Sequence, residues 1–588
     1  MSYRAPTEEC LFVMLHAGGV AEGRAAGIYP DFDDALAASL LDEAGRFAET
    51  VLAPLNRVGD QLGARFEQGD VHTPRGWREA YGHWRDGGWN GLCAPAELGG
   101  MALPHVLHAA CLDMWNAANM GFMLAPILTF GAIDAISQHG TVALKNIWLA
   151  RLVAGEWAAT MALTEPQAGS DLSTIRCRAE KNADGTYAIT GQKIFISYGE
   201  HDLTDNIVHL VLARLPGAPE GTRGISLFLV PKFLVGPDGK LGARNQVHCV
   251  GIEHKLGLHA SPTCTMAFGT DQGGATGWLI GEESRGLSCM FTMMNAARLA
   301  VGLQGVGIGE RAYQQALAFA AERRQGRAGG SGAPLAAPIL RHPDVRRMLL
   351  TMKSLTQVSR VLCYMTAAAI DRAQRLTDPS ARAGAAARAA LLTPVAKAFA
   401  TDAAIETASL GIQIHGGMGY VEETGAAQHL RDARIASIYE GTNGIQAIDL
   451  VTRKLAADSG AAMAEELARM RAVIAEARAE LDDFASASDT LDAAVGALER
   501  AGQALVGMLD GSPDLALAGA SPFLRLFALA CGGAGLAALA LGGVGPDRRR
   551  RIELAAFFAD NIACQADGLA HTVIRGGASV LAPDFALA

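Results

Sequence analysis

The stretch TYAITGQKIFIS, Thr186 to Ser197, decides the fold class of this chain because it is rich in β-forming residues within a sequence that is otherwise mostly helical in pattern. Similar short runs follow it, separated by Gly, Pro and Asp: NIVHLVLARL (206–215), GISLFLVPK (224–232) and PTCTMAFG (262–269). Closely spaced runs of this kind predict an antiparallel sheet or barrel. The β-rich region begins near Trp157 and ends near Ile280.

Helical patterns lie on both sides of this region. Before it, apolar residues recur at helical spacing in DDALAASLLDEAGRFAETVLAPLNRV, where Asp33 or Asp34 is a candidate N-cap. From Leu287 onward, long amphipathic patterns are typical of a helix bundle, and an Ala-rich helical tail follows Lys454. A chain of 588 residues is too long for one core, so several domains are expected. The predicted segments are an N-terminal extension (1–36), an N-terminal helical domain (37–157), a β-barrel domain (158–280), a helix bundle (281–455) and a C-terminal helical domain (456–588).

Composition excludes several classes of protein. The formal net charge of −10 argues against a general nucleic-acid binder. Ten cysteines without a CxxC pair suit reduced thiols in a reducing compartment, and they favour neither a disulfide framework nor a zinc site. The N-terminus carries Glu8 and Glu9 and too short an apolar run for a signal peptide. We therefore expect a cytoplasmic protein.

The stretch LFALACGGAGLAALALGGVG, Leu526 to Gly545, raises the question of a membrane span. It carries no charge and is about long enough to cross a bilayer. It is rich in Ala and Gly rather than in Leu, Ile and Phe, and four arginines follow at Arg548 to Arg551. This composition favours a helix or helix pair buried in a helical domain, and a peripheral membrane contact is the alternative.

Two stretches match the GxGxxA pattern of nicotinamide-binding proteins. One spans Gly307 to Ala312 and the other spans Gly533 to Ala538. That fingerprint requires a strand before it and a helix after it within a βαβ unit. Both matches lie in helical surroundings, so the glycines are interpreted as sites of close helix packing.

Two other stretches place polar residues at glycine-bearing turns. MALTEPQAGSDLSTI, Met161 to Ile175, leads into a small-residue turn whose N–H groups and hydroxyl can hold phosphate oxygens. RIASIYEGTNGIQA, Arg434 to Ala447, holds one carboxylate, Glu440, beside two glycines between helical patterns. Taken alone, each stretch is equally well an ordinary surface turn.

Together these motifs resemble the acyl-CoA dehydrogenase family. The resemblance runs from about residue 40 to 455. The motifs that carry it are, in order, LTEPQAGSD, GQKIFIS, GIEHKLGLHASPTCTMAF, WLIGEESRGL, QIHGGMGY and RDARIASIYEGTNGIQ. The opening MSYRAPTEECLFVML and the tail past 455 are similar to the long bacterial subgroup that includes 3-methylmercaptopropionyl-CoA dehydrogenases. The resemblance implies a mainly α fold with a central β-barrel and an additional C-terminal helical domain.

The family binds FAD between the barrel and the helix bundle. Gly169 and Ser170 match its phosphate and substrate turn, and Phe195 stands where relatives often have Trp, which preserves an aromatic face. The residues of the β-rich region that the resemblance assigns to FAD are Met161, Leu163, Thr164, Gly169, Ser170, Phe195, Ile196 and Ser197.

In this family a second subunit completes each FAD site. The resemblance therefore implies a homodimer. The residues that match segments reaching the neighbouring FAD are Arg323, Gln325, Gln413, Gly416 and Gly417. Thr442 and Gly444 match a further FAD contact.

Glu440 matches the catalytic base of the family. The chemistry needs one carboxylate near the substrate Cα–H on a backbone loose enough to place it, hence the glycines. Desolvation by the thioester and the flavin should raise the pKa of that carboxylate toward working pH. Some branches place the base at the position of Ala297, which has no acidic group. The residues matched to substrate contacts are Ser170, Asn295, Arg298 and Gly441, with Asn295 standing where relatives often have Asp.

The resemblance implies an enzyme that oxidises an acyl-CoA thioester to the trans-2-enoyl-CoA and passes the electrons to electron-transfer flavoprotein. An acyl-CoA oxidase that uses oxygen on the same scaffold is the first alternative. A DNA-binding flavoprotein is the second, and it is disfavoured because residues 456–588 hold ten Arg, no Lys and 17 acidic residues, a net charge of −7. We expect the apolar tail to pack on its own subunit's bundle.

Overall fold

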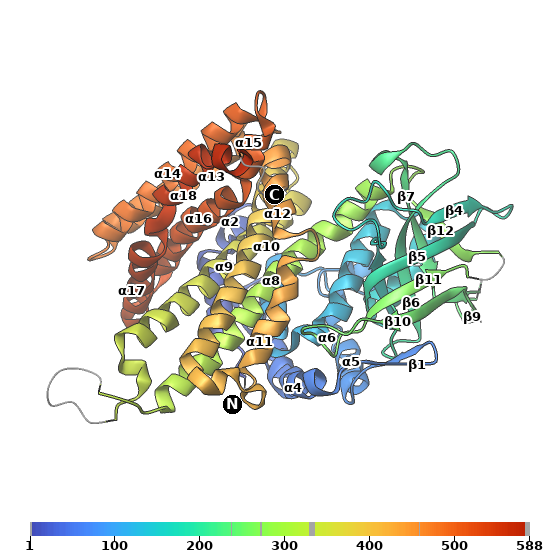
Figure 1. Cartoon of the computed structure of the whole chain (residues 1–588), viewed down its shortest axis with the longest axis horizontal. Coiled ribbons are helices and arrows are strands. Elements are labelled where there is room, and N and C mark those ends of the chain that lie inside the picture. The colour runs from blue at the N-terminus through green and yellow to red at the C-terminus, as the bar shows by residue number, and fades with distance from the viewer. Residues whose placement is uncertain (1–2, 237, 271–272, 328–335, 458, 583–588) are drawn as a thin grey trace. The chain divides into compact units, whose positions relative to one another are not determined.

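The chain from Trp157 to Ile280 folds into a β-barrel, as its runs of β-forming residues predict (Figure 1). The strands of the main sheet lie in the order β10-β11-β5-β12-β7-β6-β3, and β4 pairs with both β5 and β6. Its strands are β3 (Trp157–Ala162), β4 (Arg178–Lys181), β5 (Tyr187–Ser197), β6 (Asn206–Arg214), β7 (Ile225–Pro231), β10 (Val247–Ile252), β11 (Thr263–Phe268) and β12 (Ala275–Ile280). The computed structural model describes residues 3–236, 238–270, 273–327, 336–457 and 459–582.

The sheet is mostly antiparallel, with one long exception. β3 pairs with β6 in parallel, in a register that runs from Trp157 opposite Asn206 to Ala162 opposite Val211. A parallel pair needs a long crossover, and here β4 and β5 supply it. The sequence predicts an antiparallel sheet or barrel, and the β-forming runs do not indicate this parallel pair.

The central strands β6 and β7 are buried on both faces, which explains why their sequences are continuous apolar runs rather than alternating ones. Val208 and Leu210 of β6 belong to one apolar core, which also contains Trp148. Val211 of β6 belongs to a second core, with Phe228 of β7. Each strand thus joins two cores through alternate residues.

The segment before the barrel is helical, with one hairpin that the sequence did not predict. β1 (Arg65–Glu67) pairs with β2 (Asp70–His72) across a turn at Gln68 and Gly69, which both have positive φ. The helical elements here are α3 (Asp34–Phe47), the π-helix η1 (Ala48–Leu52), α4 (Ala53–Leu62), α5 (Trp77–Asp86), α6 (His105–His139) and α7 (Val142–Val153). Of the two candidate caps of α3, Asp33 accepts the hydrogen bond from the backbone N–H of Leu36 at 2.8 Å.

The chain divides into two compact units that cut across these segments. We call Phe47–Leu103 with Asn119–Ala297 the barrel unit. The bundle unit comprises Met1–Arg46, Pro104–Ala118 and Arg298–Ala588. The long helices α6 and α8 (Gly286–Glu322) contribute residues to both units, and α6 is interrupted at Asn119, whose backbone is not helical.

The bundle unit is built on long helices. α9 (Pro343–Arg375) and α10 (Pro379–His415) pack along each other. The shorter α11 (Ala426–Ala433) and α12 (Asn443–Asp449) pack against α10. The C-terminal helices are α13 (Ala461–Glu480), α14 (Ala485–Leu509), α15 (Pro513–Ala518), α16 (Ala520–Gly542), α17 (Gly545–Asn561), α18 (Ala566–Arg575) and α19 (Gly577–Leu581).

The apolar stretch near residue 530 forms α16, a helix buried among the other C-terminal helices and against α9, α10 and α12 (Figure 1). Among the described residues, α6, α8 and α16 are each long and apolar enough to cross a membrane. Of the apolar stretch of α16, 83% is nevertheless buried within the protein. This burial matches the interpretation that the sequence favoured, and it shows the tail packed on its own subunit's bundle.

The glycines of the two GxGxxA matches are sites of close helix packing, as predicted. A Cβ atom on Gly307 would lie 2.5 Å from the backbone nitrogen of Ala117. In α16, a Cβ atom on Gly535 would lie 2.4 Å from Val361 of α9. Neither match follows a strand, so neither is a nicotinamide-binding turn.

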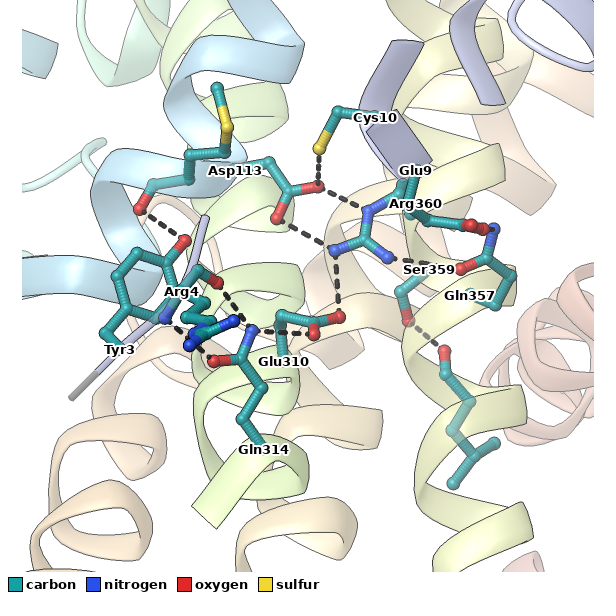
Figure 2. A network of polar contacts seen from close by, with 12 residues as sticks. Tyr3, Arg4, Glu9, Cys10, Asp113, Glu310, Gln314, Gln357, Ser359 and Arg360 are labelled. Atoms are coloured by element: carbon teal, nitrogen blue, oxygen red, sulfur yellow. Dashed lines mark hydrogen bonds and ion pairs between the residues drawn. The ribbon is translucent and has the colours of Figure 1, made fainter. Parts of the chain in front are cut away.

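The N-terminal extension forms α1 (Thr7–His16) and α2 (Val20–Ala25) within the bundle unit. Figure 2 shows the buried polar network beneath α1, which centres on Arg360 of α9. The Nε atom of Arg360 lies 2.6 Å from Asp113 Oδ2, and its Nη2 atom lies 3.1 Å from Glu310 Oε2. Gln357 bridges this guanidinium to Glu9, donating to Glu9 Oε1 at 2.7 Å and accepting from Arg360 at 3.1 Å. The extension is thereby fixed to α6, α8 and α9.

Candidate active site

Glu440 lies in the break between the 3₁₀ turn η8 (Arg434–Ser437) and α12, where the sequence predicts a glycine-bearing turn. Its φ is +57°, a left-handed conformation that is unfavourable for a glutamate, and Gly441 follows with φ +82°. A side chain with a Cβ atom at residue 441 would be strained, which explains the glycine. Strained backbone of this kind persists only where surrounding contacts fix it.

The Glu440 carboxyl has an unusual electrostatic setting. Burial within the protein raises its pKa to about 7, although the charges of Arg298 and Lys397 act in the opposite direction. The side chain itself retains partial exposure. From the sequence, a bound thioester and flavin are expected to raise the pKa of Glu440. The structure shows that the packing of the chain itself already raises it. A carboxyl group that ionises near neutral pH is suited to proton abstraction.

Arg298 of α8 is buried and paired, as predicted. Its Nη1 atom lies 3.3 Å from Asp449 Oδ2, and Asp449 also pairs with Arg453 at 2.5 Å. Ala297, its neighbour in α8, is buried. Asn295 is exposed on the same helix.

Lys397 is a residue of this site that the sequence did not reveal. It lies on α10, is completely buried, and donates to Gly441 O at 3.0 Å and to Asn443 Oδ1 at 2.9 Å. Lys397 precedes Glu440 by 43 residues, so local spacing carried no signal of their proximity. Gln446 adds a second donor to Gly441 O, at 3.2 Å.

Residues predicted to contact FAD meet at one edge of the barrel. The backbone N–H of Ile194 in β5 donates to Thr164 O at 2.9 Å, so the segment after β3 continues beside β5. Phe195 has φ +59° at a register shift opposite Cys264 and Met266, and its side chain is 58% exposed. Met161, Leu163 and Ser197 are half-buried along this edge, and Ile196 is buried.

The Gly169–Ser170 turn is held by a buried ion pair that the sequence did not reveal. Glu165 pairs with Lys193 at 2.8 Å and accepts from the backbone N–H groups of Arg176 and Cys177. Although burial raises the pKa of Glu165, the Lys193 ammonium and these N–H donors hold it below its ordinary value. Gly169 and Ser170 are exposed.

Exposed residues gather where α8 and α10 end. The ring of Phe319 stacks on His415 at 4.4 Å between centroids. Arg323 follows Phe319 by about one helical turn, and Gly416 follows His415 directly, so the two predicted segments belong to the same part of the bundle unit. Within the described chain the Arg323 guanidinium has no ion-pair partner. Gln325, Gln413 and Gly417 are likewise exposed.

Thr442 and Gly444 lie at the start of α12. The hydroxyl of Thr442 accepts from the backbone N–H of Ile445 at 3.2 Å and caps the helix. Gly444 is exposed. The predicted residues therefore fall into two groups: the barrel unit holds those from Met161 to Ala297, and the bundle unit holds those from Arg298 to Gly444.

Both groups of predicted residues lie in segments that match models of known protein domains. Models of the acyl-CoA dehydrogenase N-terminal, middle and C-terminal domains match residues 37–156, 160–270 and 284–456. A model described as acetyl-CoA dehydrogenase C-terminal like matches residues 466–584. 3-Methylmercaptopropionyl-CoA dehydrogenase of Ruegeria pomeroyi is 49% identical over 532 residues, which cover 90% of this chain and 89% of that protein.

The chain belongs to the acyl-CoA dehydrogenase family. The extent of the identity also places this acyl-CoA dehydrogenase in the long subgroup that the sequence indicated. ACDH-11 of Caenorhabditis elegans, solved in complex with C11-CoA, has a TM-score of 0.79 at 20% identity and covers 95% of this chain and 94% of its own. An acyl-CoA dehydrogenase of Bacillus anthracis complexed with FAD has a TM-score of 0.73 at 21% identity, covering 95% and 90%. These two likenesses show the shared fold.

Acyl-CoA dehydrogenases use FAD, and the residues of this chain fit a flavin. The exposed ring of Phe195 offers an aromatic face to a planar ring system. Apart from the adjoining residues, no atom of the described chain lies within 4 Å of a Cβ built on Gly169, Gly416 or Gly417, so a ligand can approach the backbone closely at each of them. The exposed Arg323 guanidinium is the kind of donor that binds a pyrophosphate.

Proposed function

We propose that this acyl-CoA dehydrogenase converts an acyl-CoA thioester to the trans-2-enoyl-CoA with Glu440 as the base, and that electron-transfer flavoprotein accepts the electrons. The supporting observation is the setting of Glu440: its backbone is left-handed, burial raises the pKa of its carboxyl to about 7, and the charges of Arg298 and Lys397 act on it. FAD, when bound, accepts the hydride from the substrate Cβ. The protein's part is to remove the Cα proton and to polarise the thioester.

The backbone around Glu440 supports both tasks. Its carboxyl ionises near neutral pH, so a substantial fraction is available as the base. Within the described chain, the backbone N–H of Glu440 donates to no protein acceptor, and it is therefore available to the thioester oxygen. The proposed substrate contacts are Ser170, Asn295, Arg298 and Gly441. Stopped-flow bleaching of the flavin by acyl-CoA without oxygen tests this reaction directly.

The choice of electron acceptor separates the dehydrogenase from an oxidase. After anaerobic reduction by substrate, we expect slow reoxidation in air and fast reoxidation by electron-transfer flavoprotein. Reoxidation in air at the rate of turnover would instead assign the chain to the oxidases. The two outcomes are read from the same flavin absorbance.

For the acyl group, we propose a short thioester of the 3-methylmercaptopropionyl type. Support comes from the 49% identity to the Ruegeria pomeroyi enzyme. The matched comparison is pentanoyl-CoA, in which a methylene replaces the sulfur atom. A higher kcat/KM for the sulfur compound would support this substrate class, whereas a preference for long straight chains would refute it.

We also propose a cytoplasmic homodimer. Met418, Tyr420 and Val421 form an exposed apolar patch after α10, with Tyr420 86% exposed, next to the glycines predicted to reach the partner's FAD. A patch of this kind is typical of an interface. Among the described residues the ten cysteines form no disulfide bond, which suits a reducing compartment. Light scattering and cell fractionation test the two statements, and no nucleic-acid binding is expected in a gel-shift titration.

A further inference from the structure

Lys397 is an unusual residue in the bundle unit because it is a buried ammonium held by neutral groups. Its side chain is completely buried. Its hydrogen-bond acceptors are Gly441 O at 3.0 Å and Asn443 Oδ1 at 2.9 Å. Among the described residues, no carboxylate lies within ion-pair distance, 4.0 Å, of its Nζ atom. Burying a charge in this way is costly, so its contacts indicate a specific task.

Both acceptors belong to the turn that carries Glu440. Gly441 is the next residue after Glu440, and its carbonyl is held from two sides, by Lys397 and by Gln446 at 3.2 Å. Asn443 is fixed in turn, because its side-chain amide donates to α10 at Ala398 O and at Asp402 Oδ1. Lys397 thus connects α10 to the turn at the point where two successive residues, Glu440 and Gly441, have left-handed backbone.

We propose that Lys397 is a positioning residue for the reaction: it fixes the Glu440–Asn443 turn in one conformation and supplies a positive charge that acts on the Glu440 carboxylate from beyond ion-pair distance. This inference rests on the proposed role of Glu440 as the base. Lys397 itself is not among the proposed substrate contacts. The lysine acts only through the position and the charge environment of the carboxylate.

The charges around Glu440 make this effect measurable. The cationic groups that act on it are Arg298 from α8 and Lys397 from α10. Arg298 is partly neutralised by Asp449 of α12, and Asp402 of α10 acts on Lys397. Burial lowers the pKa of Lys397 to about 8, so it is mostly protonated near neutral pH. Loss of its charge should therefore raise the pH at which Glu440 ionises.

The test uses Lys397→Met, which keeps the length of the side chain and removes the ammonium, and Lys397→Gln, which keeps a donor for Gly441 O. Anaerobic flavin reduction by saturating acyl-CoA is measured between pH 5.5 and 9, together with the Kd of the thioester. We expect the rate constant in Lys397→Met to fall roughly tenfold to a hundredfold. The midpoint of the rise with pH should move up by roughly 1 pH unit in both variants. The Kd should change less than about threefold, because the lysine does not contact substrate.

A second readout does not depend on activity. Hydrogen–deuterium exchange of the peptide that spans residues 434–447 should be faster in Lys397→Met than in the wild type, because the turn loses a fixed contact. Lys353→Met is the control, since it also removes an ammonium from the bundle unit, at a half-buried position on α9. It should destabilise the protein without moving the pH midpoint or the exchange of this peptide.

The outcomes separate this inference from the proposed function. Wild-type protein whose flavin no acyl-CoA bleaches would refute the proposed function, and the exchange experiment would still decide the role of Lys397 in the turn. An active wild type with unchanged rate, midpoint and exchange in Lys397→Met would overturn the inference alone. Loss of fold or of bound FAD in both Lys397 variants would assign the residue to bundle stability and would also overturn it.

Discussion

Arg551 of α17 forms a two-pronged ion pair with Glu9 of α1: its Nη1 atom lies 3.0 Å from Glu9 Oε1 and its Nη2 atom lies 2.9 Å from Glu9 Oε2. The same guanidinium lies 3.6 Å from the ring centroid of Phe12 and pairs with Asp547. The last of the four consecutive arginines is therefore an internal contact. It joins the C-terminal helices to the N-terminal extension.

Replacing Arg551 with Met should lower the free energy of unfolding by about 1 to 3 kcal/mol, because Glu9 would remain largely buried without its strongest donor. Burial raises the pKa of Glu9, but the hydrogen bond from Arg551 and the charge of Lys353 outweigh this and hold the pKa below its ordinary value. The stabilisation is thus present above the ordinary pKa of a glutamate and is lost as the pH falls through the lowered pKa. Urea unfolding at pH 7 measures the loss.

The control for this prediction is Arg549→Met, a change of the same kind on the same helix. Arg549 is exposed, and among the described residues it pairs only with Glu553, four residues later. An exposed pair of this kind contributes less than about 1 kcal/mol. Equal stability of the two variants would show that the Arg551–Glu9 pair is not stabilising.

Glu440→Gln should retain FAD and bind acyl-CoA while losing flavin reduction by a factor of at least about 10² to 10⁴. The substitution keeps the shape of the side chain and removes the base, and Ala297 offers no substitute. Anaerobic bleaching is the measurement. Glu476→Gln, at an exposed position on α13, is the control and should leave bleaching unchanged. Bleaching of Glu440→Gln at the wild-type rate would remove Glu440 from the mechanism.

Flavin reduction in the wild type should rise with pH around neutrality. The base must be ionised to accept a proton, and burial raises the pKa of Glu440 to about 7. The rate is therefore low at pH 5.5 and approaches a plateau above the pKa that applies in the complex. A flat profile between pH 5.5 and 8.5 would contradict the assignment of this residue.

Arg323→Ala should weaken FAD retention by about 1 to 3 kcal/mol and should also weaken the dimer. The guanidinium is exposed at the end of α8, in the segment predicted to reach the partner's cofactor. Arg341→Ala is the control. This arginine is also exposed, and it lies two residues after Ile339, whose backbone N–H donates to Arg323 O. The measurements are flavin content after dialysis and sedimentation velocity. Tight FAD binding in an unaltered dimer would refute the assignment.

Truncation after Lys454 should cause aggregation or higher assembly. It removes α16, whose glycines pack against α9 at Val358 and Val361, and so exposes an apolar face of the bundle. Light scattering compares the truncated and full-length proteins. A full-length tetramer would contradict the proposed homodimer, and flotation of the intact protein with liposomes would favour membrane contact.

Much of the fold was predictable because its signals are local. The β-forming runs between Trp157 and Ile280 and the glycine-bearing break at Glu440 can each be recognised within about a dozen residues. The short β1–β2 hairpin was missed because three-residue strands carry too little pattern, although Gly69 marks its turn.

The parts of the site that could not be predicted are long-range partners. Lys193 holds Glu165 from 28 residues away, and Lys397 holds the Glu440 turn from α10. A buried lysine and an exposed one are the same letter in a sequence. Only the folded chain shows that these ammonium groups have lost water and gained particular acceptors.

The pairing of Glu9 with Arg551 has a consequence for synthesis on the ribosome. The two residues are 542 positions apart, so at about 5 to 20 residues per second Glu9 leaves the exit tunnel roughly half a minute to two minutes before its partner is made. During that interval the acidic helix α1 can rest on the bundle only through its other contacts. The N-terminal helix therefore reaches its final packing only after α17 has been made. A chain that stalls or terminates early lacks this packing at both of its ends.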